Sequence, residues 1–278
     1  MAKAPSGPRT SRPSRPRKPG RTPEAPATPA RGDGRVPLER ALSKLGLASR
    51  AEARRLILAG RATVDGAAAG DPDALVVPER IEVAIDGRLA GPLPPLTVLL
   101  HKPRGVVTTR ADPRGRPTVY SFLGGIDRHL GPVGRLDAAT SGLLLLTSDT
   151  RFGDWVTDPA NGVPRVYVVA VRGEVSDEEA ARLVHGVEEG EERLTARAAA
   201  VRKRSRRESH LTVELTEGKN REVRRMLAAI GHPVTRLKRV AFGGLELGPL
   251  APGEHRAVPA AELAAAFPGA PLRRSKAR

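Results

Sequence analysis

Four consecutive leucines, Leu143–Leu146, constrain the fold of this chain more than any other stretch. They lie in "SGLLLLTSD", a short apolar run bounded by polar and turn-forming residues. Side chains of a strand point alternately to opposite faces of the sheet, so an unbroken apolar run predicts a strand that is buried on both faces.

The remainder of residues 95–268 also favours strands. Two helices are expected among them, one that begins with a capping box of Ser176 and Glu179 and one in "KNREVRRMLAAIG". Because strands dominate and no regular βαβ alternation is present, we expect an α+β domain on a mostly antiparallel or mixed sheet with flanking helices. The further stretches that predict strands are "TVLLHKP", "RVYVVAVRG", "SHLTVELTEG" and "TRLKRVAFGG".

A smaller domain is expected over residues 36–94. "VPLERALSKLGLA" has apolar residues at helical spacing, and "SRAEARRLILAG" opens with a capping box of Ser49 and Glu52 and ends at Gly60. Asp-Gly turns follow in "ATVDG" and "RIEVAIDG", which favour short hairpins. The proline-rich "AGPLPPL" then predicts a linker to the larger domain.

Positive charge is concentrated at the two ends of the chain, whose net charge is +16. Residues 1–35 carry a net charge of +7 and eight prolines, and residues 269–278 carry +4 with no acidic residue, so both are expected to be disordered basic tails. Within the folded part, the second helix of the smaller domain places Arg50, Arg54 and Arg55 on its outer side. They could contact a phosphate backbone or form only a solvated charged face.

Several classes of protein are disfavoured by what the sequence lacks. The absence of cysteine removes disulfides, thiol nucleophiles and cysteine-ligated zinc, and it fits a reducing compartment. Phosphate-loop, dinucleotide, zinc-protease and serine-hydrolase motifs are absent, and the six histidines show no metal-ligand spacing. No apolar run approaches the ~20 residues of a membrane span. We expect a soluble cytoplasmic protein that binds no membrane, metal or cofactor and builds its site from carboxylate, arginine and aromatic side chains.

The segment "GRLDAATSG" places a single carboxylate, Asp137, shortly before the leucine strand. Gly134 and Gly142 permit a tight loop, and the buried strand beneath it would hold the loop rigid. Such a loop can position a catalytic side chain, but Asp, Thr, Ser and Gly are also ordinary turn residues. From the residues alone, Asp137 is either a catalytic carboxylate or a turn residue.

Two further segments offer groups suited to a site. Tyr167 in "RVYVV" shares a strand face with two valines, so its ring is either a core residue or a platform that stacks on a nucleobase. In "KNREVRRML" the helical period turns Arg221 and Arg225 away from the apolar face and leaves Arg224 at its edge, where it could pair with a carboxylate. These arginines could equally form a solvated helix face, while the runs "RKRSRR" and "RLKR" favour a polyanionic partner.

Together these segments resemble a known family. "KPRGVVTT", "GRLDAATSGLLLLTSD", "RVYVV", "EGKNREVRRML" and "FGGLELGPLAPGEHR" occur in the order found in the RsuA/RluB-type ribosomal RNA pseudouridine synthases. "LERALSKLGLASRAEARRLILAGRATVDG" is similar to the αL RNA-binding module named after a small-subunit ribosomal protein. The resemblance covers about residues 36–258.

The resemblance implies isomerisation of uridine to pseudouridine in ribosomal RNA by a single aspartate without a cofactor, with large-subunit RNA weakly favoured. It implies that Asp137 is the catalytic aspartate, that Tyr167 packs on the target base, and that Arg224 pairs with Asp137. Covalent attack and proton abstraction by Asp137 both remain open. The residues expected to contact RNA are Arg50, Arg54, Arg55, Arg135, Lys219, Arg221 and Arg225.

The chain departs from the family's pattern at two positions beside the expected site. Arg165 stands where lysine is usual, and Glu222 stands where glutamine is more usual. Both changes are expected to affect contacts to RNA more than the chemistry. The expected partner is ribosomal RNA or a pre-ribosomal particle, and the expected state is a monomer.

Two other functions compete with this interpretation. A non-catalytic RNA-binding or ribosome-assembly protein would need the N-terminal module but not the set of Asp137, Tyr167 and Arg224. A glycosidase that releases the base would need a second carboxylate as its acid. Asp127 and Asp149 are available for that role, and neither lies in a comparable motif.

Overall fold

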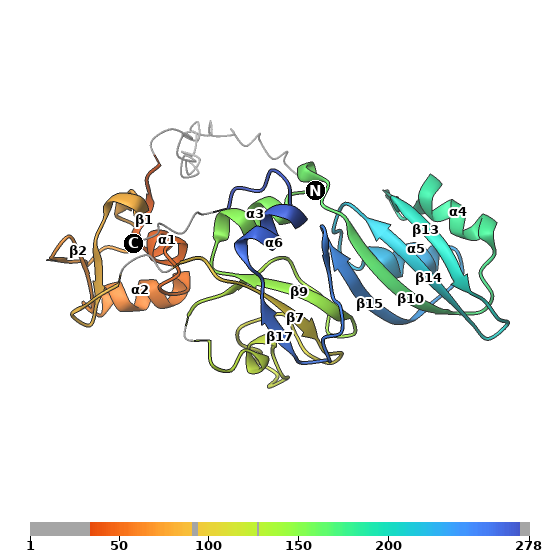
Figure 1. The fold of residues 1–278 in the computed structure, drawn as a ribbon, viewed down its shortest axis with the longest axis horizontal. Helices are drawn as coiled ribbons and strands as arrows, with labels where there is room; N and C mark the ends of the chain where they lie inside the picture. Colours follow the sequence, from red (N-terminus) through yellow and green to blue (C-terminus); the bar gives the residue numbers. More distant parts are fainter. Residues whose placement is uncertain (1–33, 91–93, 127, 273–278) are drawn as a thin grey trace, which may run out of the picture. The chain divides into compact units, whose positions relative to one another are not determined.

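The computed structural model describes residues 34–90, 94–126 and 128–272. Nearly all of the predicted N-terminal tail, the middle of the predicted linker and the last six residues of the chain lie outside these ranges. The folded residues form two parts, 34–90 and 94–272, and Figure 1 labels their longer elements.

The first part consists of two helices and short strands. Helix α1 spans Leu38–Lys44 and helix α2 spans Arg50–Leu58. Strands β3, β2, β5 and β6 form an antiparallel sheet in that order, and β1 pairs with β4. The strands are β1 (Val36–Pro37), β2 (Ala62–Val64), β3 (Ala67–Ala68), β4 (Leu75–Val76), β5 (Val83–Ile85) and β6 (Arg88–Leu89).

Local sequence signals explain the boundaries of these elements. The Ser49 hydroxyl accepts a hydrogen bond from the Glu52 amide at 3.1 Å and caps α2, as predicted. The chain leaves α2 through Gly60, whose φ is +66°. Asp65 and Asp86 both adopt positive φ before a glycine, as the tight turns between β2 and β3 and between β5 and β6 require. The apolar faces of both helices pack in one small core with β2 and β5.

The second part is built on one nine-stranded mixed sheet, in agreement with the predicted α+β class. Its main strands follow the order β13, β14, β10, β15, β9, β7 and β17, while β16 pairs with β15 and β8 pairs with β9. All pairs are antiparallel except β15 with β9. The strands are β7 (Thr97–Lys102), β8 (Gly131–Pro132), β9 (Ser141–Thr147), β10 (Arg165–Arg172), β13 (Ala198–Lys203), β14 (Glu208–Leu215), β15 (Val234–Phe242), β16 (Leu245–Glu246) and β17 (His255–Ala257).

The leucine run forms β9 and is buried on both faces, as predicted. Leu144 and Leu146 enter one apolar cluster, and Leu143 and Leu145 enter another on the opposite side. All four leucines have no exposed surface. The alternation of side chains along a strand therefore divides the interior into two cores with β9 between them.

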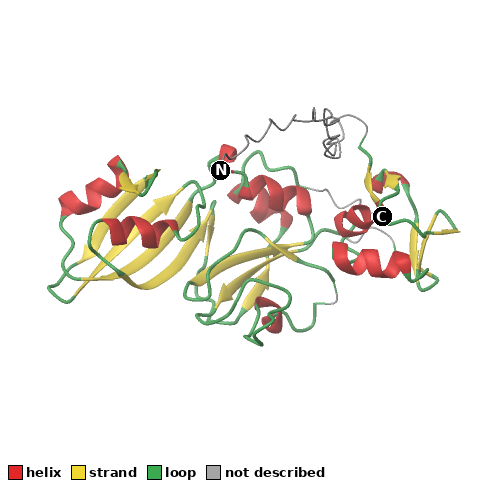
Figure 2. Cartoon of the chain, turned by 180° about the vertical axis from the view of Figure 1, so that it is seen from behind, coloured by secondary structure: helices red, strands yellow, loops and turns green. Residues whose placement is uncertain are grey.

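Helices flank the sheet (Figure 2), and their side chains contribute to both cores. Helices α4 (Asp177–His185) and α5 (Glu222–Ala229) contribute to the core of Leu144. Helices α3 (Thr150–Thr157) and α6 (Ala260–Ala266) contribute to the core of Leu143. A hairpin of β11 (Val187–Glu189) and β12 (Glu192–Leu194) follows α4, which begins with the predicted capping box. Single-turn helices lie at Pro78–Arg80, Val119–Phe122 and Pro159–Asn161.

Two features of the larger part differ from the sequence analysis. Helices α3 and α6 were not predicted. Helix α3 has only eight residues, and α6 is a run of alanines around one leucine, so neither offers several turns of large apolar residues at helical spacing. Residues 269–272, predicted to begin a disordered tail, are described, and Ala270 and Leu272 pack against the core of α3 and α6. Among the described residues, no helix is long and apolar enough to cross a membrane.

Candidate active site

The loop that carries Asp137 is held by hydrogen bonds to its backbone. Every carbonyl oxygen from residue 136 to residue 140 accepts one, so the loop is fixed while the Asp137 side chain keeps 41% of its surface exposed. The donors are, in chain order of the carbonyls, Thr108 Oγ1 (2.8 Å), the Thr140 amide (3.0 Å), the Gly105 amide (2.7 Å), Arg224 Nη2 (3.1 Å) and Lys102 Nζ (2.8 Å).

Lys102, at the end of β7, is an anchor of this loop that the sequence analysis missed. Its side chain has no exposed surface, and Nζ donates to the carbonyl oxygens of Pro103 at 2.9 Å and Thr140 at 2.8 Å. Burial lowers the pKa of Lys102 to about 8, and the charge of Asp137 opposes that shift. The available signal was a lysine as the last residue of the short strand "TVLLHK", all of whose residues are buried.

Gly142 brings β9 and β15 together directly beside the loop. It pairs with Arg239 in the parallel ladder, and its φ is +109°. A Cβ atom at this position would lie 2.1 Å from the backbone oxygen of Arg239, inside any allowed contact. Only glycine therefore permits the approach that joins the Asp137 loop to the strand bearing Arg239.

A cavity of about 560 Å³ opens in front of Asp137. Its volume lies within the range of small-molecule sites. The loop, β10, the segment before α5 and the end of β15 all contribute to its wall. The lining residues used below are Arg135, Asp137, Arg165, Tyr167, Glu217, Lys219, Arg221, Glu222, Arg239 and Phe242.

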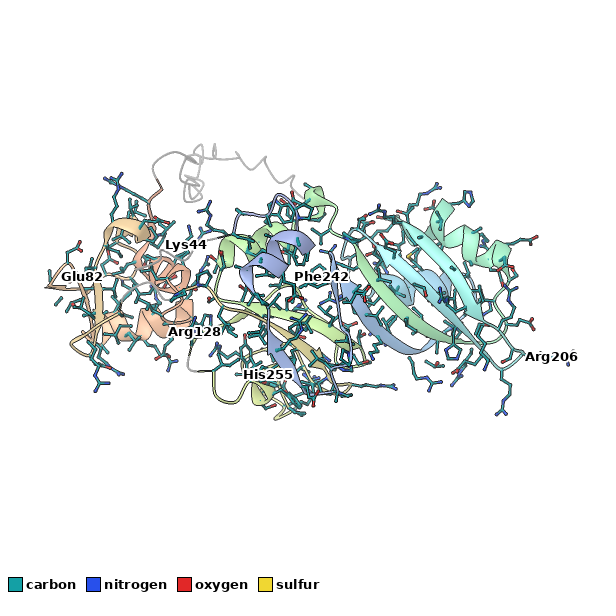
Figure 3. All side chains as sticks on the ribbon, in the orientation of Figure 1. Lys44, Glu82, Arg128, Arg206, Phe242 and His255 are labelled. Atoms are coloured by element: carbon teal, nitrogen blue, oxygen red, sulfur yellow. The ribbon has the colours of Figure 1, made fainter. Side chains whose placement is uncertain are left out.

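Tyr167 lies on the wall of this cavity and is 9% exposed, so it is both a core residue and a cavity residue. Arg239 is its register partner on β15, and the two side chains interact. The Arg239 guanidinium stacks 4.5 Å from the ring centre of Phe242, which Figure 3 labels, and Nε donates to the Leu143 carbonyl oxygen at 2.8 Å. Burial lowers the pKa of Arg239, and Tyr167 opposes that shift.

The arginines around α5 are arranged differently from the prediction. Arg221 Nη1 forms the ion pair with Asp137, at 3.6 Å, whereas Arg224 donates to the carbonyl oxygens of Ala139 and Val234. The predicted contact between Arg224 and Asp137 is therefore replaced by a contact to the backbone of the same loop. The reason is that α5 begins only at Glu222, so Arg221 precedes it in a left-handed conformation with φ +50°, where a helical period does not apply.

The guanidinium of Arg225, which is expected to contact RNA, is engaged by the β11–β12 hairpin. It forms ion pairs with Glu189 and Glu192, and these two carboxylates hold its pKa above the ordinary range. An arginine with two acidic partners has less capacity to bind phosphate. The sequence could not show this, because both acids lie more than thirty residues earlier in the chain.

Arg165 and Glu222, the two departures from the family's pattern, lie in the wall of the cavity rather than beside it. Arg165 is buried and donates to the carbonyl oxygens of Val163, Thr216 and Val156. Burial is the main cause that lowers the pKa of Arg165 and raises that of Glu222, to about 7. Both residues thus help to shape the site.

The remaining residues expected to contact RNA are divided between the two parts of the chain. On α2, Arg50, Arg54 and Arg55 are exposed as predicted, although Arg54 pairs with Glu39 and Asp73 and Arg55 pairs with Glu52. Arg135 is exposed at the cavity, and Lys219 pairs there with Glu217 at 3.1 Å. In the "RLKR" run Arg239 is buried, so it does not belong to a solvent-facing basic surface.

Asp149, one of the two carboxylates considered for a glycosidase, is used as a helix cap. Asp149 is 2% exposed and caps α3 by accepting hydrogen bonds from the amides of Arg151 and Phe152. Its place at a helix start explains its burial. Asp127 lies outside the described residues.

Comparison with known proteins decides among the families considered. A family model for RNA pseudouridylate synthases matches residues 97–229, and an S4 domain model matches residues 36–80. An RNA pseudouridine synthase of Aquifex aeolicus is 34% identical over 233 residues, which cover 84% of this chain and 94% of that relative. The chain belongs to the RNA pseudouridine synthase family.

Two other similarities agree with this assignment. The relative named ribosomal large subunit pseudouridine synthase B in Bacillus subtilis is 34% identical over 221 residues, covering 79% of this chain and 90% of that protein. A crystal structure of a pseudouridylate synthase has the same fold, with a TM-score of 0.56, 24% identity and coverage of 82% of this chain and 98% of its own. This pseudouridine synthase therefore carries an S4 domain ahead of its catalytic domain.

Proposed function

We propose that this pseudouridine synthase acts on uridine in ribosomal RNA, with large-subunit RNA as the favoured substrate, and that Asp137 is its catalytic residue. The observation that carries the proposal is the Asp137 carboxylate at the cavity, on a loop whose backbone is fixed at five successive carbonyl groups. A partly exposed carboxylate on a rigid loop can meet a flipped-out nucleotide without rearrangement. The name of the Bacillus subtilis relative supports the choice of large-subunit RNA.

The isomerisation breaks the N1–C1′ bond of uridine and forms a C5–C1′ bond in its place. The C5 hydrogen leaves as a proton and N1 gains one, so the reaction is balanced without an oxidant, a reductant or a cofactor. Asp137 would act on the ribose while Tyr167 packs on the detached base during its rotation. An ionised carboxylate is required for either nucleophilic attack or proton abstraction.

Arg221 and Arg224 would have separate roles in this scheme. Arg221 is in contact with Asp137 and can hold its carboxylate toward the ribose. Arg224 positions the loop through the Ala139 carbonyl group, and its effect on Asp137 is indirect. The proposal places Arg135 and Lys219 at the phosphates that flank the target nucleotide, and Arg50 of α2 on a more distant part of the RNA.

The test uses unmodified transcripts of small- and large-subunit ribosomal RNA that carry tritium at C5 of uridine. Release of tritium to water reports the reaction, and we expect the wild-type protein to release it from large-subunit RNA. Asp137→Asn, checked by mass spectrometry for deamidation, should release none while it still binds the transcript. Glu246→Gln, a change of equal charge at an exposed position on β16, serves as the control.

The outcomes separate the competing functions. Binding of the transcripts by the wild-type protein without tritium release would favour a non-catalytic RNA-binding protein. Release of free uracil would indicate a glycosidase. Turnover by Asp137→Asn would refute the role of Asp137. The proposal also includes a monomer that works in the cytoplasm, which sedimentation and fractionation would check.

A further inference from the structure

The strands around β10 have one face that points away from α4 and α5. Tyr167, Val169 and Val171 of β10 point into the core to which these helices contribute (Figure 2). Side chains alternate along a strand, so Val168 and Ala170 point to the opposite side, where Val168 keeps 40% of its surface exposed. We call this side the open face, and its central residues, by strand pairing, are Val168, Ala170, His210, Thr212, Arg236 and Lys238.

A second pocket, of about 290 Å³, lies on the open face beside the Asp137 loop. Its lining includes Ala139 and Ser141, which follow Asp137 closely in the chain, and Leu237, which also lines the larger cavity. The two hollows therefore adjoin the same loop and the same residue of β15. An RNA whose target nucleotide enters the larger cavity brings neighbouring nucleotides close to this second pocket.

Among the described residues, the lining of the second pocket contains cations and no carboxylate. The cations are Arg104, Arg236 and Lys238, and His210 lies beside them. Arg236 and His210 both pair with Glu208, at 2.8 Å. Within the part of the chain that the structure describes, Arg104 and Lys238 form no ion pair, so both remain available to an anion.

The two available cations also repel positive charges around them. Burial is the main cause that lowers the pKa of Arg224, and the charges of Arg221 and Arg104 add to it. Burial likewise lowers the pKa of His101, and the charge of Lys238 adds to it. A phosphate group in the second pocket would relieve this repulsion.

The rest of the second pocket is apolar and suits a nucleobase. Val168, Ala170 and Leu237 contribute to its lining. A nucleotide combines an apolar base face with a charged phosphate, and a guanidinium such as that of Arg104 can stack on a base. An acidic peptide offers carboxylates without a flat apolar group, so the pocket favours RNA.

A basic run continues the open face at the far end of β13. Residues 202–207, "RKRSRR", span the end of β13 and the turn to β14, where Figure 3 labels Arg206. All six residues are exposed. Arg204 pairs with Asp177, and the other cations of the run form no ion pair with any residue that the structure describes. Positive charge therefore extends from the Asp137 loop across the open face to this turn.

We propose that the open face binds the strand of substrate RNA beside the target nucleotide, with an unpaired base against Val168 in the second pocket and its phosphates at Arg104 and Lys238. The run at residues 202–207 holds the same strand farther from the target. This inference deepens the proposed function and rests on it.

The direct test uses a single introduced thiol, because the chain contains no cysteine. Val168→Cys places the thiol on the open face, and Val184→Cys places it on α4, at a position with the same exposure of 40%. An excess of large-subunit transcript should slow alkylation of Val168→Cys by the neutral reagent N-ethylmaleimide several-fold and leave that of Val184→Cys unchanged. Equal rates for Val168→Cys with and without transcript would overturn the inference.

The same measurement tests whether an unpaired base enters the second pocket. Single-stranded oligouridylate should protect Val168→Cys, whereas the same strand paired with oligoadenylate should not, since a paired base cannot enter. Equal protection by the duplex would refute the placement of a base in the pocket.

Two pairs of variants test the charge of the open face. Val168→Glu and Val168→Gln differ by one charge, and Val168→Glu should bind the transcript several-fold more weakly and raise KM for tritium release. Lys238→Ala should reduce the slope of log affinity against log salt concentration by about 0.7, the value for one contact to a single strand. Arg182→Ala, the same loss of charge at an exposed position on α4, is the control and should leave the slope unchanged. No difference within either pair would contradict the proposal, and thermal unfolding of each variant distinguishes a lost contact from a lost fold.

The failure of this inference differs from the failure of the proposed function. No tritium release by the wild type would refute the proposed function and, with it, the placement of the strand beside a target. Release by the wild type together with an unprotected thiol in Val168→Cys would leave the proposed function intact and overturn the inference. Protection of Val168→Cys by purified ribosomal proteins and not by the transcript would assign the open face to a protein partner, which also overturns it.

Discussion

Replacement of Gly142 by alanine is expected to disrupt the catalytic domain far more than the same change at Gly134. Both glycines have positive φ, +109° and +71°, so both alanine variants carry backbone strain. At Gly134 the added Cβ would meet only the Thr157 methyl group at 3.6 Å, an ordinary contact. At Gly142 it would lie 2.1 Å from the backbone oxygen and 2.7 Å from the backbone nitrogen of Arg239.

The difference between the variants can be estimated from these contacts. Strain at positive φ costs about 1–3 kcal/mol and should be the whole effect in Gly134→Ala. In Gly142→Ala the strands must also separate by more than an ångström. The parallel pairing of β9 with β15, which consists of Ser141 with Lys238 and Gly142 with Arg239, would then be lost. We expect a total loss above about 4 kcal/mol, the range that marks a specific structural failure.

Urea unfolding of both variants, followed by circular dichroism, measures this difference. Tritium release at a temperature where Gly134→Ala is folded provides the functional comparison. If the two variants lose stability equally, the close approach of the strands at Gly142 is not a constraint, and our account of how the loop joins β15 is wrong.

Three further predictions concern charged side chains. Arg221→Ala should lower kcat without changing the unfolding free energy, since its side chain is 51% exposed. Arg224→Ala should also cost about 1 kcal/mol of stability in urea unfolding, because it removes hydrogen bonds to two partly buried carbonyl groups. Lys102→Met should slow tritium release, because the Asp137 loop loses two hydrogen bonds that anchor it. The melting temperature should change little, because relief of a buried charge partly offsets the loss of these bonds. Tritium release at the wild-type rate would rule out an anchoring role for Lys102. Arg50→Ala should reduce the slope of log affinity for RNA against log salt concentration by about 0.7–0.9. Arg54→Ala should reduce the slope by less, because Glu39 and Asp73 already neutralise Arg54. Equal slopes for the two variants would contradict this difference between the arginines.

The sequence was sufficient where one local pattern determined one element. The leucine run predicted a strand buried on both faces, and the Ser49 and Ser176 caps marked helix starts. The resemblance also selected Asp137 and Tyr167, and both lie in the wall of one cavity. The strand and the two caps depended on residues close together in the chain, and each of the two site residues was selected by the short motif around it.

Contacts between distant segments were beyond the reach of the sequence. The contact of Arg221 with Asp137 depends on a left-handed residue before α5, which a helical wheel extended through Lys219 could not reveal. The ion pairs of Arg225 depend on a hairpin more than thirty residues earlier. Lys102 and Arg239 were missed because burial of a charged residue is decided by the fold and not by its neighbours in sequence.

The position of β15 between β10 and β9 has a consequence for synthesis of the protein. A chain emerging from the ribosome makes the Asp137 loop about a hundred residues before the strand that completes the sheet beside it. Until β15 inserts, β9 and β10 are edge strands with unpaired backbone groups, which are prone to pair wrongly. The nascent enzyme thus cannot form its cavity before the C-terminal strands are available. Because contacts between residues far apart in the sequence form slowly, insertion of β15 is the expected rate-limiting step of folding.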